Sequence, residues 1–119
     1  MDLRRERPTR VQPAVMTIRP DPSQENPMPL FVLTYGYHDT PLRAERRDDH
    51  LAHLGGLEQS GHLVAAGPLA DLSGGIILLR ADDEPSAQAL VDQDPYTQLD
   101  VTKDRRLREW RVTVGSVTG

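Results

Sequence analysis

The sequence predicts one α+β domain whose elements follow the order β-α-β-β-α-β, and three observations support this order. Residues 31–38 alternate in side-chain character with the period of a strand. Residues 43–60 carry apolar side chains at helical spacing and run into Gly61, a residue type that often ends helices. Two more strand signals, a second helix signal and a last strand signal follow. This succession is typical of the split β-α-β, or ferredoxin-like, arrangement.

The remaining elements each have a local signal. The second strand covers residues 63–66 and the third residues 76–80, both bounded by turn residues. The second helix covers residues 84–93, because Pro85 is tolerated in a first helical turn and apolar side chains follow at helical spacing. The last strand is predicted over residues 107–114, where the alternation returns.

The predicted sheet has a face that its own helices cannot cover. Two helices cover one face of a four-stranded sheet, yet both faces of these strands carry apolar side chains. An uncovered apolar face of this size indicates a partner, so we expect a homodimer.

Residues 1–29 differ in kind from the rest. Six of the ten prolines fall there, with no apolar periodicity, so we expect a disordered, proline- and arginine-rich tail. The domain is predicted over residues 30–115, followed by a short tail over residues 116–119. The chain of 119 residues is near the lower end of what buries an adequate core.

Charge and composition argue against several classes of partner. The N-terminal tail has a net charge of +1 and residues 30–119 a net charge of −5, so the body repels phosphate and we expect no nucleic-acid binding. No apolar run approaches the roughly 20 residues that span a bilayer. There is no cysteine, which excludes thiolate metal ligands and disulfides. We expect a cytoplasmic protein that does not bind membranes.

The first helix carries the principal candidate for chemistry, His50. On a helical wheel Arg47, Leu54 and Leu57 lie within about 60° of His50, which places the histidine and Arg47 on the buried stripe. A histidine in that place can also be a core or interface residue whose two nitrogens are satisfied.

Asp94 is the second candidate, because Pro95 fixes the backbone that presents its carboxylate. If Asp94 reaches a ring nitrogen of His50, it sets the tautomer and leaves the other nitrogen as a general base. The alternative is that Asp94 is a turn residue that ends the second helix.

Three more residues are candidate contacts to a substrate. Arg47 can bind a carboxylate through two hydrogen bonds, or pair with an acid of the protein. Tyr96 can donate to a developing oxyanion, or pack at the sheet edge. The backbone of Gly67 can admit a substrate, or serve the turn.

No metal or cofactor is expected. His50 and His53 are three residues apart on one helix and could share a metal, but His62 lies at the opposite end of that helix. Two ligands fall short of the usual protein metal site.

Three stretches together resemble a known family. They are Arg47-Asp48-Asp49-His50-Leu51, Gly61 to Pro68 (G-H-L-V-A-A-G-P) and Asp94-Pro95-Tyr96. In this order and spacing they resemble the YCII-related (YciI-like) domain family over about residues 31–114. The resemblance implies a dimeric α+β barrel whose sheets pack face to face, with His50 and Asp94 at the positions of the family's proposed catalytic pair.

The function expected from the sequence is binding of a small cyclic or anionic organic molecule. If the protein is an enzyme, the reaction is cofactor-free proton transfer by His50 and Asp94, as in an isomerisation, an elimination or a dehalogenation. The alternative is a non-catalytic ligand-binding or accessory dimer.

Overall fold

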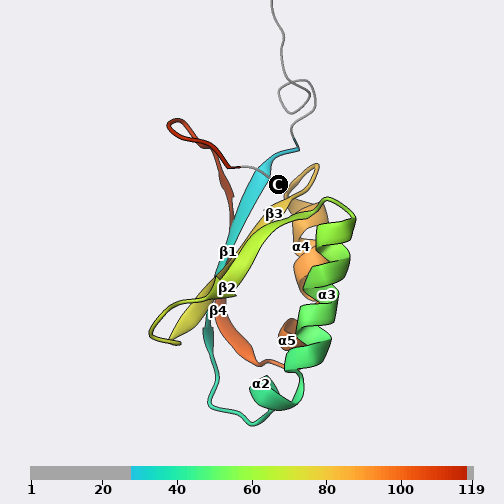
Figure 1. Cartoon of the computed structure of the whole chain (residues 1–119), viewed down its shortest axis with the longest axis vertical. Helices are drawn as coiled ribbons and strands as arrows, with labels where there is room; N and C mark the ends of the chain where they lie inside the picture. The colour runs from blue at the N-terminus through green and yellow to red at the C-terminus, as the bar shows by residue number, and fades with distance from the viewer. Residues whose placement is uncertain (1–27, 118–119) are drawn as a thin grey trace, which may run out of the picture.

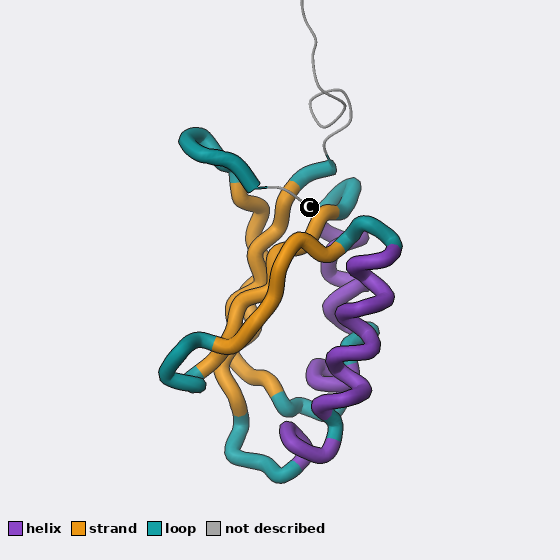
Figure 2. The backbone as a smooth tube through the Cα atoms, in the orientation of Figure 1, coloured by secondary structure: helices purple, strands orange, loops and turns teal. Residues whose placement is uncertain are grey.

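The computed structural model describes residues 28–117, which form one sheet with helices packed on one of its faces (Figures 1 and 2). The predicted α+β fold and its β-α-β-β-α-β order are confirmed, with two short helices added. No helix in this described part of the chain is both long and apolar enough to cross a bilayer. The elements are β1 (Leu30–Tyr37), α2 (Leu42–Glu45), α3 (Arg47–Gln59), β2 (Leu63–Pro68), β3 (Gly74–Arg80), α4 (Glu84–Asp92), α5 (Pro95–Gln98) and β4 (Thr102–Trp110).

The sheet is antiparallel throughout, with strand order β2-β3-β1-β4. Across the central pair, Phe31 lies opposite Leu79 and Leu33 lies opposite Ile77. Directly opposed residues project from the same face of a sheet, so these four side chains form one apolar stripe. The helices cover that stripe.

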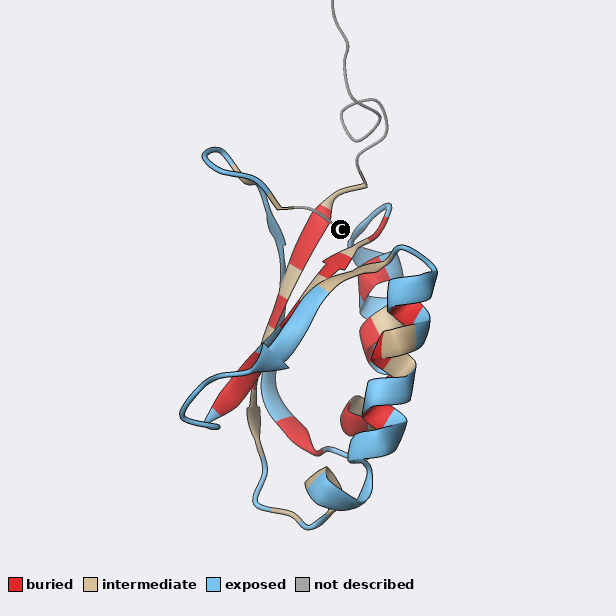
Figure 3. Cartoon of the chain, viewed as in Figure 1, coloured by how far each residue is buried: buried red, intermediate tan, exposed pale blue. Residues whose placement is uncertain are grey.

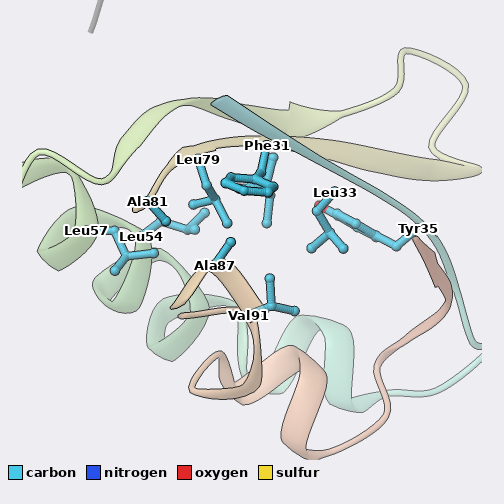
Figure 4. Close-up of a cluster of buried hydrophobic side chains, with 10 residues drawn as sticks. Phe31, Leu33, Tyr35, Leu54, Leu57, Leu79, Ala81, Ala87 and Val91 are labelled. Carbon is cyan, nitrogen blue, oxygen red and sulfur yellow. The ribbon is translucent and has the colours of Figure 1, made fainter. Parts of the chain in front are cut away.

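The hydrophobic core fills the space between this stripe and helices α3 and α4 (Figure 4). Phe31 and Leu79 are each 1% exposed. Leu54 and Leu57 enter the core from α3, and the small Ala87 brings α4 close to the sheet. The buried positions of α3 and α4 gather where the helices face the strands (Figure 3). Each large apolar side chain buried here contributes about 1.5–3 kcal/mol.

The opposite face of the sheet is left open by the described part of the chain. Val32, Ile76, Leu78 and Trp110 line a broad groove on it, together with the polar residues Arg108 and Glu109. Ile76 and Trp110 are exposed. The expectation that the helices cover only one face is confirmed.

The last strand lies further towards the N-terminus than the predicted residues 107–114. β4 ends at Trp110, and no regular structure follows it up to residue 117. Its first half is highly charged, yet it pairs with β1 through backbone hydrogen bonds, and an edge strand can hold charged side chains in solvent. The register shifts between Thr34 and Gly36, and Asp104 has a φ of 53°, as at a bulge.

The predicted first helix, residues 43–60, is two helices. The chain leaves helical geometry at Arg46, where φ is −106° and ψ is 10°, so α2 and α3 are separate. Gly61 follows α3 with a φ of 85°, as expected of a residue that ends a helix. Gly55 and Gly56 of α3 do not mark a close contact between this helix and the sheet, because a β-carbon at either position would meet nothing within 4 Å.

The predicted tails lie wholly or partly outside the described residues, whereas the predicted domain, residues 30–115, lies within them. The predicted N-terminal tail lies outside them apart from Met28 and Pro29, as do residues 118 and 119 of the predicted C-terminal tail. Arg80 donates hydrogen bonds to the carbonyl oxygens of Met28 and Val117, at 3.0 and 3.4 Å. These bonds hold the two ends of the described segment together beside β3.

Candidate functional site

His50 lies in the first half of α3, on the side that packs towards the sheet. It is buried together with Leu54 and Leu57, one and two turns further along the helix. The helical spacing of the sequence therefore placed this histidine correctly.

Asp94 is held at the junction between α4 and α5. Its carboxylate accepts a hydrogen bond from the backbone N–H of Tyr96 at 2.9 Å, which caps α5. Pro95 occupies the first turn of that helix, where a missing N–H costs nothing. Asp94 is 5% exposed, so the carboxylate is removed from water and needs partners within the protein.

The hydrogen bond expected between His50 and Asp94 is present. Nδ1 of His50 lies 2.9 Å from both carboxylate oxygens, although the two residues are 44 positions apart in the chain. An ionised carboxylate only accepts, so Nδ1 must carry the proton and donate it. In the neutral ring the lone pair then resides on Nε2, which leaves that nitrogen able to take up a proton.

Tyr96 supports both members of this pair. Its ring stacks on the His50 ring with centroids 4.0 Å apart and planes within 2° of parallel. Its hydroxyl donates to the carbonyl oxygen of Arg43 at 2.6 Å. Burial raises the pKa of the Tyr96 phenol, so the hydroxyl stays protonated and keeps this bond at neutral pH. Tyr96 is thus a packed tyrosine with a committed hydroxyl.

A cavity of about 230 Å³ opens beside His50, between α3, the N-terminal end of α2 and the β2 edge of the sheet. An apolar cavity of about 150 Å³ holds one benzene molecule, so this space suits a ligand with a single ring. Four of the five predicted site residues line it, His50, Arg47, Gly67 and Tyr96, while Asp94 lies behind His50. The other lining residues are Tyr35, Tyr37, Arg43, Leu51, Leu54, Ala66 and Pro68.

The helical wheel placed Arg47 on the buried stripe, and this prediction was wrong, although Arg47 does line the cavity. The residue is exposed, because it is the first residue of α3 and the buried side of this helix begins one turn later, at His50. Arg43, which sequence reasoning missed, lines the same cavity from α2. Its guanidinium lies 3.7 Å from the centroid of the Tyr37 ring, a cation–π contact that holds it in place. Spacing of four residues between the two arginines was the available signal.

Tyr35 and Tyr37 also line the cavity and were missed as site residues. They alternate with small residues along β1 and therefore share the face that carries Phe31 and Leu33. Two phenols on the helix-covered face of a strand were the signal that could have indicated a polar site there.

Two of the other three histidines, His53 and His62, have structural partners. His53 donates from Nε2 to the carbonyl oxygen of Leu90 at 3.1 Å, and His62 donates from Nδ1 to that of Arg80 at 2.8 Å. Within residues 28–117, no group of three or more histidine, aspartate or glutamate side chains is arranged to hold a metal ion.

Comparison with known proteins places the chain in a family. The fold is similar to that of 5-chloro-2-hydroxyhydroquinone dehydrochlorinase from Burkholderia phenoliruptrix AC1100, solved in complex with 2,5-dihydroxybenzoquinone. The TM-score is 0.61 and the identity 19%, over 69% of this chain and 93% of that one. Among proteins with curated descriptions, none matches. The sequence profile of the YCII-related domain matches residues 21–111, and the chain therefore belongs to the YCII-related domain family.

Proposed function

We propose that this protein binds a small organic molecule in the cavity and transfers a proton to or from it with His50, assisted by Asp94. The observation that carries the proposal is the buried bond between Nδ1 of His50 and the Asp94 carboxylate, beside a cavity that His50 itself lines. A carboxylate on one ring nitrogen makes the other a stronger base. No cofactor is needed for such a step.

In this mechanism Nε2 of His50 takes the proton and Asp94 stabilises the imidazolium that forms. Two negative oxygens at 2.9 Å from Nδ1 favour the charged ring. Tyr96 keeps the ring in one plane through the stack, and Arg47 pairs with an acidic group of the ligand at the open side of the cavity. The backbone of Gly67 contacts the ligand from β2.

Elimination is the reaction class that we favour among proton transfers. The structural neighbour is named as a dehydrochlorinase, and loss of hydrogen chloride begins with a base that removes a proton. The identity of 19% makes this an analogy of fold, so isomerisation and hydrolytic dehalogenation remain within the proposal.

The second candidate is a non-catalytic ligand-binding or accessory domain. It is favoured by the burial of His50, which is 7% exposed and covered on one side by the Tyr96 ring. A histidine sealed in this way can serve packing alone.

Replacing Asp94 by Asn tests the pair. The change removes the negative charge beside Nδ1, so we expect the His50 ring to lose its proton at a lower pH than in the unaltered protein. An NMR titration of the ring protons measures this, with His62, which has its own backbone partner, as the internal control. Identical titration of His50 in both proteins would remove the catalytic proposal and leave the binding domain.

We also propose that the open sheet face packs against a second copy of the chain, in the cytoplasm. Val32, Ile76, Leu78 and Trp110 would otherwise present a contiguous apolar patch to water. Light scattering at micromolar concentration should give twice the chain mass of 13.3 kDa. Ile76→Glu, at an exposed position within the patch, should give a monomer. A monomeric unaltered protein would contradict the proposed dimer.

A further inference from the structure

The sheet side of the cavity is formed by two tyrosines of β1, while His50 approaches from the helix side. Tyr35 is 8% exposed, and Tyr37 is half-buried. Their rings meet edge to face with centroids 5.6 Å apart. Both tyrosines therefore line the same cavity as His50, Tyr35 and Tyr37 from the sheet and His50 from the helix.

At least one O–H group of Tyr35 and Tyr37 is available to donate a hydrogen bond to a ligand. The hydroxyl of Tyr96 donates to a backbone carbonyl, but within residues 28–117 no backbone carbonyl or carboxylate accepts from Tyr35 or Tyr37. A hydrogen bond between the two hydroxyls would use only one of the two O–H groups, since each hydroxyl has a single proton. Buried donors are normally paired, so a spare donor beside a cavity indicates an acceptor that arrives with the ligand.

Gly75 determines where the Tyr35 hydroxyl lies. The glycine is directly opposite Tyr35 in the β1–β3 pair, and a β-carbon at this position would collide with the Tyr35 hydroxyl oxygen. The same β-carbon would lie 3.0 Å from the carbonyl oxygen of Gly67, which lines the cavity. The missing side chain thus leaves room for the Tyr35 hydroxyl over Gly75 of β3, next to the β2 residue Gly67 that also lines the cavity.

The surroundings keep the tyrosines as donors. Burial raises the pKa of the Tyr35 phenol, and the neighbouring Tyr37 adds to the rise, so Tyr35 holds its proton throughout the neutral range. The Arg43 guanidinium over the Tyr37 ring adds positive charge at the same side. A negative oxygen of the ligand finds both hydrogen-bond donors and a cation there.

We infer that Tyr35 and Tyr37 form an oxyanion site for the ligand, facing His50. This inference rests on the proposed proton transfer. The ligand bond to hydrogen breaks, the proton goes to Nε2 of His50, and the electron pair ends on a ligand oxygen. That oxygen accepts a hydrogen bond from the tyrosine pair, and both tyrosines keep their protons. The ligand class is thereby a single-ring molecule with an oxygen that becomes negative, such as an enol or a phenol.

Binding of 4-nitrophenolate, a single-ring oxyanion with visible absorbance, tests the site without a turnover assay. We expect the full chain to bind it and Tyr35→Phe to bind it about tenfold more weakly, because a hydrogen bond to a charged group is lost. Tyr37→Phe should also weaken binding if the two hydroxyls act as a pair. Absence of binding to the unaltered protein, or equal binding by Tyr35→Phe, would overturn the inference.

A matched pair of glycine substitutions distinguishes the effect of moving the Tyr35 hydroxyl from the effect of removing it. Gly75→Ala retains both tyrosines but displaces the Tyr35 hydroxyl, so it should weaken nitrophenolate binding as Tyr35→Phe does. Gly36→Ala is the control on the neighbouring strand, since its β-carbon would make only ordinary contacts, at 3.6 Å from Lys103. Melting temperatures of both variants show whether they fold. If Gly75→Ala does not fold, Tyr35→Phe alone decides the result.

The outcome is distinguishable from that of the proposed function. The oxyanion site is read from phenolate affinity, and the proton transfer from the His50 titration in Asp94→Asn. Normal coupling of His50 to Asp94 with unchanged phenolate binding in Tyr35→Phe would leave the proposed function and remove the oxyanion site.

Discussion

The space between the sheet and the helices is filled differently at its two ends. At the α4 end, Phe31, Leu79 and Ala87 pack with almost no exposed surface. At the α2 and α5 end, Tyr35 and His50 border a cavity of about 230 Å³. One strand, β1, runs through both ends and carries Phe31 into the first and Tyr35 into the second.

The difference between the two ends shows how a small domain can keep a cavity beside its core. The packed end stabilises the sheet and helices through apolar burial. The cavity end is bordered on β2 by Ala66, Gly67 and Pro68, whose side chains are too small to fill the space below α3. The polar side chains at the cavity end are held by hydrogen bonds and stacking instead. These contacts fix the positions of the site residues on helices and strands.

The largest contrast is expected from truncating a leucine at each end. Leu79→Ala should lower the free energy of unfolding by about 3 kcal/mol, because it leaves a void in a closely packed core. Leu51→Ala, at a cavity-lining residue that is 44% exposed, should lower it by less than about 1 kcal/mol. Urea denaturation measures both. Equal losses would mean that the cavity end is as closely packed as the other.

A second contrast compares two aspartates that cap helices. Asp83 caps α4 at the surface, accepting from the Ser86 N–H at 2.9 Å. Asp94 caps α5 and also accepts from His50 in a buried place. Asp94→Ala should lower the free energy of unfolding by about 2 kcal/mol, the sum of a lost cap and an unpaired buried donor. Asp83→Ala loses only the cap and should cost less.

Thermal and urea unfolding of the two alanine variants decide between these roles. If the losses are the same, the His50 bond adds no stability beyond the cap, and the pair is retained for reasons other than holding the fold.

Sequence reasoning was most successful where a pattern is local. Helical spacing placed His50 beside Leu54 and Leu57, and Asp94-Pro95-Tyr96 was recognised as a rigid turn because the side chain, the proline and the N-cap act within three residues. The pairing of His50 with Asp94 was expected from the predicted fold, which brings both helices to one side of the sheet, and from the resemblance to the YCII-related family.

Sequence reasoning failed where contacts between residues distant in the sequence determine the structure. Arg43 lines the cavity because the helix is interrupted at Arg46, and Tyr35 lines it because Gly75 leaves room for its ring. Neither effect is visible in a periodic pattern. The early start of β4 was missed for a similar reason: backbone pairing to β1 holds residues whose charged side chains carry no strand signal.

The smallest expected effect concerns Tyr35 at high pH. Burial raises the pKa of its phenol above that of an unfolded chain, which is about 10. Below that pH both states hold the proton and stability is unaffected. Above it the unfolded chain ionises first, so the free energy of unfolding falls as pH rises towards the folded-state pKa. Tyr35→Phe removes this contribution, and its stability should decline less steeply between pH 9 and 11 in urea titrations. Parallel declines in the two proteins would mean that the Tyr35 hydroxyl contacts water in the folded state. The sheet side of the cavity would then be open to solvent.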